Sequence, residues 1–64
     1  MENHIEMATR HVRDAQAIVE RQRQMVEYRR ERGWDCKLSL SLLATFKATL
    51  LFFERDLARL TAGA

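Results

Sequence analysis

The sequence contains no proline and only two glycines, Gly33 and Gly63, so very little in it interrupts a helix. Its single cysteine, Cys36, excludes an intramolecular disulfide and fits a reducing compartment. The formal net charge of +2 is too small to indicate a nucleic-acid-binding protein by itself. With 64 residues there is room for one domain, 1–64, and such short chains usually need a disulfide, a metal or another chain for stability.

The N-terminal stretch MENHIEMATRHVRD is polar and mixed in charge, so it has the character of neither a signal peptide nor a transit peptide. We therefore expect a cytoplasmic protein.

The segment ERGWDC is the one strong interruption of the helical pattern. Gly33 can adopt the left-handed conformation that ends a helix, and Trp34 can then fold back onto Tyr28. Asp35 is a suitable N-cap for the next helix. The sequence therefore predicts an all-α antiparallel hairpin with helices over about 3–32 and 36–61.

Apolar and small residues repeat along both predicted helices with spacings of three and four. In the first helix they are Ile5, Ala8, Val12, Ala15, Val19 and Val26, with Gln22 and Arg29 in the same series and Ile18 and Met25 widening one flank. In the second they are Leu43, Phe46, Leu50, Phe53, Leu57 and Leu60. Folding the chain at residue 34 pairs residues whose numbers sum to about 68, which places Ala15 by Phe53 and Gln22 across from Phe46 and Thr49.

The second helix has more apolar residues than one interface with the first helix needs. The surplus residues form a predicted self-association face: Leu38, Ala44, Ala48, Leu51 and Phe52. A membrane span is disfavoured, because it needs about 20 apolar residues and a central Lys47 costs about 2.5–3.5 kcal/mol on insertion. We expect instead that two hairpins form a dimeric four-helix bundle with the second helices at its centre, or that an unidentified protein partner covers this face.

The sequence offers few residues for chemistry. His4 and His11 lie about 10 Å apart along a helix, too far to share one metal ion within a single chain. Cys36 has no histidine nearby in the sequence, so we expect a passive thiol. No enzymatic activity, metal or cofactor is expected.

Four arginines near the predicted turn, Arg21, Arg23, Arg29 and Arg30, form a candidate phosphate-binding tip for RNA or DNA. Glutamates are interleaved with them at ion-pairing spacing, as in Glu20–Arg23, which is typical of a solvated surface. Nucleic-acid binding is therefore the alternative to a protein-interaction or regulatory role.

The sequence contains an Arg-Gln-Arg segment (21–23), Gly33 with Asp35, a Leu-Leu-Ala-Thr-Phe segment (42–46) and Thr49 with Leu50. In these elements it resembles a family of short hypothetical proteins from alphaproteobacteria. The chain departs from that pattern over 36–41 and is more apolar at 51–53. The resemblance covers about residues 11–60 and implies a bacterial cytoplasmic helical hairpin, without implying an activity.

Overall fold

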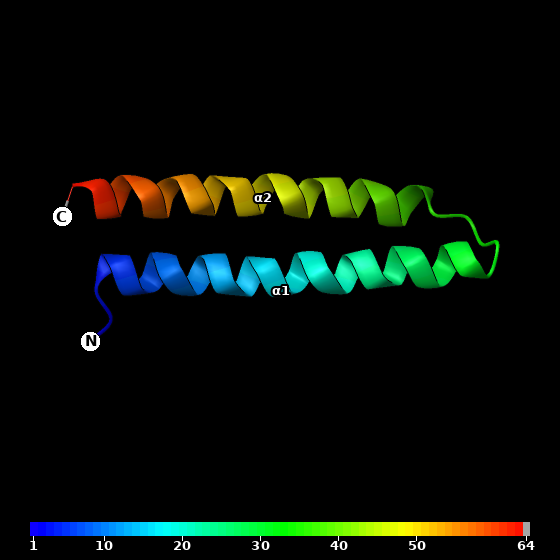
Figure 1. The fold of residues 1–64 in the computed structure, drawn as a ribbon, viewed down its shortest axis with the longest axis horizontal. Coiled ribbons are helices and arrows are strands. Elements are labelled where there is room, and N and C mark those ends of the chain that lie inside the picture. The colour runs from blue at the N-terminus through cyan, green and yellow to red at the C-terminus, as the bar shows by residue number, and fades with distance from the viewer. Residues whose placement is uncertain (64) are drawn as a thin grey trace.

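The computed structural model describes residues 1–63 as two antiparallel helices joined by a short connection (Figure 1). Helix α1 comprises His4–Glu31 and helix α2 comprises Lys37–Ala62, so the predicted all-α hairpin is confirmed and each bound lies within one residue of the expected position. The first and last described residues lie at the same end of the hairpin (Figure 1). Residues 38–42, in which leucine and serine alternate as they can in a strand, are helical throughout.

The end of α1 is a Schellman motif built around Gly33, which has a φ of 70°. The Gly33 N–H donates to the carbonyl of Arg30 at 3.0 Å, and the Trp34 N–H donates to the carbonyl of Arg29 at 2.9 Å. The Trp34 ring packs edge-on against Tyr28 with 6.0 Å between ring centroids. Both parts of this prediction, the glycine stop and the aromatic fold-back, are confirmed.

The start of α2 differs by one residue from the prediction. The N-cap is Cys36, which makes no side-chain capping bond, whereas Asp35 lies one residue earlier and accepts a hydrogen bond from the Lys37 N–H at 2.9 Å. The carboxylate therefore still satisfies one of the free amides of the first turn. In α1 the corresponding role belongs to Asn3, whose side chain accepts from the Glu6 N–H at 2.8 Å.

Six of the seven buried residues that the structure describes were predicted to lie between the helices, and the exception is Ser39. Buried side chains on α1 are Ala8, Ala15, Val19, Gln22 and Val26, and those on α2 are Ser39 and Leu43. Phe46 and Leu50 pack against the cluster of Val19, Val26 and Leu43. Alanines opposite phenylalanines and leucines allow the two helices to approach closely.

The register at Gln22 differs from the prediction. Its side-chain amide donates to the carbonyl oxygen of Ser39 at 3.2 Å, rather than facing Phe46 and Thr49. The chain already contacts α1 at Cys36, at the end of the connection of 32–36, where Sγ lies 3.9 Å from the Val26 carbonyl oxygen. Ser39 lies seven residues, or about two turns, before Phe46, so the buried amide finds its partner nearer the connection than expected.

The hairpin measures 48 × 19 × 12 Å, so its smallest dimension is that of a single helix. Neither described helix has an apolar stretch long enough to cross a membrane.

Candidate functional site

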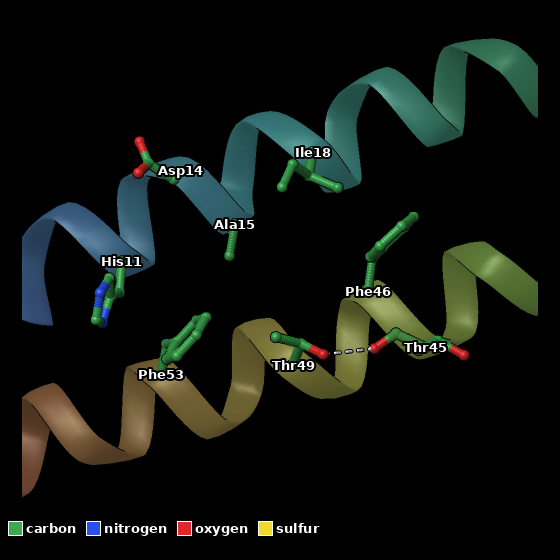
Figure 2. Close-up of a pocket in the computed structure, with 8 residues that line it drawn as sticks. All are labelled: His11, Asp14, Ala15, Ile18, Thr45, Phe46, Thr49 and Phe53. Carbon is green, nitrogen blue, oxygen red and sulfur yellow. Dashed lines mark hydrogen bonds between the residues drawn. The ribbon is translucent and has the colours of Figure 1, made fainter.

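One broad face of the hairpin carries an apolar groove between α1 and α2, with a volume of about 240 Å³ (Figure 2). We call this side of the molecule the groove face. The residues that line the groove are His11, Asp14, Ala15, Ile18, Thr45, Phe46, Thr49 and Phe53. Figure 2 shows Ile18 and Ala15 on α1 above Phe46 and Phe53 on α2, with Asp14 directed outward at the rim.

The groove exists because Ala15 is too small to fill the space beside its neighbours. The His11 ring lies against Phe53, with 5.1 Å between centroids and an angle of 37° between ring planes, and closes one end. Polar groups on the α2 side are satisfied within the helix: Thr45 Oγ1 donates to the Ser41 carbonyl and Thr49 Oγ1 to the Thr45 carbonyl, each at 3.1 Å. The floor of the groove therefore presents little that would favour water.

Further apolar side chains extend the groove face toward the turn. Met25 lies seven residues after Ile18, and Leu42 lies seven residues before Thr49, so each shares a helix face with a groove residue. Met25 and Leu42 are exposed in the hairpin. The groove is thus the deepest part of a longer apolar strip.

The structure divides the predicted self-association face into two parts. All five residues are exposed, with 73% of Leu38, 68% of Phe52 and 47% of Leu51 accessible to solvent. Leu38 and Phe52 lie seven residues on either side of Thr45 and therefore share its side of α2, although neither lines the groove itself. The other three, Ala44, Ala48 and Leu51, follow a second stripe of α2, which is turned away from the groove and which we call the outer edge.

The four candidate phosphate-binding arginines do not share one surface. Arg21 and Arg23 are two residues apart, so their side chains project about 200° apart around α1. Arg23 makes an ion pair with Glu20 at 3.7 Å, as its spacing predicted. Arg29 is half-buried beside the interface between the helices, and Arg30 is exposed.

A different arginine makes the aromatic contact at the turn. The guanidinium carbon of Arg32 lies 3.4 Å from the centroid of the Tyr28 ring, in a cation–π arrangement. Tyr28 and Trp34 lie among the arginines in the sequence, but the sequence does not indicate that Arg32 packs on Tyr28. Because Arg32 covers one face of Tyr28, that face is not free to stack on a nucleic-acid base.

The remaining candidates for chemistry stay separate in space. Within residues 1–63 no three histidine, cysteine or acidic side chains converge as metal ligands. Cys36 is half-buried, with Sγ 3.4 Å from the Trp34 carbonyl oxygen and 3.9 Å from that of Val26. His11 belongs to the groove and His4 lies a further two turns along α1.

No family model, curated protein or solved structure matches this chain. The class of the molecule is therefore defined by its geometry: it is a single antiparallel helical hairpin with an open apolar groove on one broad face.

Proposed function

We propose that this protein is a non-enzymatic, self-associating helical-hairpin module that forms a homodimeric four-helix bundle and serves a protein-interaction or regulatory role. The observation that carries the proposal is the thickness of the molecule, 12 Å, which corresponds to one layer of helices. Stable domains generally enclose their apolar side chains between two layers.

The burial of individual side chains agrees with an incomplete core. In the part of the chain that the structure describes, no large side chain reaches full burial, and the core is confined to small or β-branched residues and one leucine. Several leucines and Phe52 remain exposed. Covering a side chain of this size contributes about 1.5–3 kcal/mol, so a second layer stabilises the hairpin substantially.

Self-association is better supported than binding of RNA or DNA. The arginines that would bind phosphates project from different sides of α1, whereas the apolar side chains of the groove face form a continuous strip. Nucleic-acid binding by exposed arginines would also require a patch of one charge, and Glu20 neutralises Arg23.

Sedimentation equilibrium across a range of protein concentrations tests the proposal. The expected result is a reversible monomer–dimer equilibrium, with the dimer predominating at micromolar concentration. The same dimer predicts that the midpoint of thermal unfolding rises with protein concentration. A protein that stays monomeric at hundreds of micromolar, with a midpoint independent of concentration, contradicts the proposal.

A further inference from the structure

We infer that a second copy of the chain docks on the groove face, with the two α1 helices crossing antiparallel at Ile18 and the two turns at opposite ends of the dimer. This inference rests on the proposed self-association and specifies its surface. It differs from the sequence-based expectation that one face of α2 forms the interface, with Leu38, Ala44, Ala48, Leu51 and Phe52 together.

The dimensions of the groove face fit a stable dimer. The two longer dimensions of the hairpin, 48 and 19 Å, limit the projected area of this face to at most about 900 Å². A standard stable interface buries about 800 Å² on each partner. The outer edge of α2 is only as wide as one helix, so it offers a much narrower surface than the groove face.

Two opposite charges on the groove face flank Ile18 at similar distances. Asp14 lies four residues before Ile18 and Arg21 lies three residues after it, and all three share one side of α1. Within residues 1–63 neither Asp14 nor Arg21 forms an ion pair. A two-fold axis at Ile18 brings Asp14 of each copy to the partner's Arg21, so the same contact forms twice.

The other residues of the groove face are compatible with the same two-fold axis. His11 lies seven residues before Ile18 and Met25 lies seven residues after it, so the axis at Ile18 places each of these residues against the other in the partner. On α2, Thr45 and Thr49 meet their counterparts near the centre. Leu42 then lies over the part of the partner's α2 that carries the phenylalanines.

The charges also select this orientation over its alternative. If the two turns lay at the same end, α1 of one copy would lie over α2 of the other. Asp14 and Arg21 would then face the side of α2 that carries Leu42, Thr45 and Thr49, where neither finds a charged partner. Only the arrangement with opposed turns pairs both charges.

Two leucines of α2 provide a matched test. Leu42 belongs to the groove face and is 40% exposed, whereas Leu51 belongs to the outer edge and is 47% exposed. In sedimentation equilibrium we expect Leu42→Glu to raise the dimer Kd by about 100-fold or more, because each dimer buries this position twice. Leu51→Glu is expected to leave the Kd within about threefold of the wild-type value. Circular dichroism checks that both variants remain helical.

A charge exchange tests the orientation with exposed residues only. Asp14→Arg and Arg21→Asp each create two like-charged contacts in the dimer, and each is expected to raise the Kd about tenfold. The double variant Asp14→Arg/Arg21→Asp restores both pairs and is expected to return the Kd to near the wild-type value. This rescue is the result that a merely structural role of either residue does not produce.

The outcomes separate this inference from the proposed function. A dimer that is broken by Leu51→Glu but not by Leu42→Glu overturns the groove interface and leaves self-association standing. A dimer in which the double charge variant is as weak as the two single changes combined overturns the opposed-turn orientation. A wild-type chain that is monomeric, whether or not it binds RNA or another protein through its groove, overturns the proposed function itself.

Discussion

The side-chain amide of Gln22 on α1 donates a hydrogen bond to the backbone carbonyl of Ser39 on α2, with 3.2 Å between Nε2 and the oxygen. Both residues are buried, so this hydrogen bond joins α1 to α2 in the interior of the hairpin. A buried amide of this kind fixes the register of one helix against another, since sliding by one residue leaves the amide without a partner.

Gln22→Ala is expected to lower the free energy of unfolding by about 1–3 kcal/mol, through loss of the hydrogen bond and of buried volume. Gln22→Leu is the control, since it keeps the volume, and it is expected to cost less than about 1 kcal/mol. Urea denaturation at a fixed protein concentration measures both. Equal losses for the two variants would show that the hydrogen bond contributes nothing beyond packing.

Gly33→Ala tests the left-handed stop at the end of α1. A Cβ at this position meets nothing within 4 Å, so the cost arises only from the φ of +70° and is expected to be about 1 kcal/mol. Gly33→Asn is expected to cost less, because asparagine tolerates this conformation. Gly63→Ala is a matched control with φ of −89° and should change the thermal midpoint very little. A neutral Gly33→Ala would contradict the role assigned to the turn.

The contact between Tyr28 and Trp34 is measurable by a double-mutant cycle. Their rings are 6.0 Å apart in an edge-on arrangement, and both are about half exposed, so we expect a coupling free energy near 0.5 kcal/mol. The cycle uses Tyr28→Leu, Trp34→Leu and the double variant in chemical denaturation. A coupling indistinguishable from zero would show that the fold-back of Trp34 adds nothing to the Schellman motif.

A pH-dependent ion pair joins Glu2, which precedes α1, to Arg10 in the second turn of that helix. Arg10 donates hydrogen bonds to both carboxylate oxygens of Glu2, at 3.1 and 2.9 Å, and this holds the pKa of Glu2 below its ordinary value of 4.5. The pair therefore stabilises the first turn fully above pH 4.5, and this stabilisation is lost as the pH falls through the lowered pKa. NMR titration of the Glu2 carboxyl carbon should give a pKa below 4.5, and Arg10→Gln should raise it. A pKa that is unchanged in the variant would exclude the pair.

The sequence was sufficient to predict the hairpin because its signals are local and agree with one another. The spacing of three and four from Ala8 to Val26, the left-handed glycine and the aromatic residue after it each depend on neighbouring residues only. The same reasoning located Gln22 between the helices but assigned the wrong partner, because the register depends on how far the connection carries α2 before it packs.

The groove face could not be predicted in the same way. The sequence shows that Ile18 and Met25 are apolar residues on one flank of α1, yet their spacing does not show whether α2 covers them. That depends on the angle at which α2 lies on α1, which periodicity along a single helix leaves undetermined. The threonines of α2 hid the matching flank, because their hydroxyl groups read as polar until their hydrogen bonds within the helix are seen.

The central claim is that a second copy covers the groove face with its turn at the opposite end, and the distance between two spin labels tests it most directly. A label on Glu31→Cys in a Cys36→Ser background lies 13 residues from Ile18, or about 20 Å along α1. We expect pulsed electron paramagnetic resonance on the dimer to give a distance of about 40 Å between labels, twice that value. A distance near 20 Å, which corresponds to turns at the same end, would contradict the account. So would the absence of any dipolar coupling between the two labels.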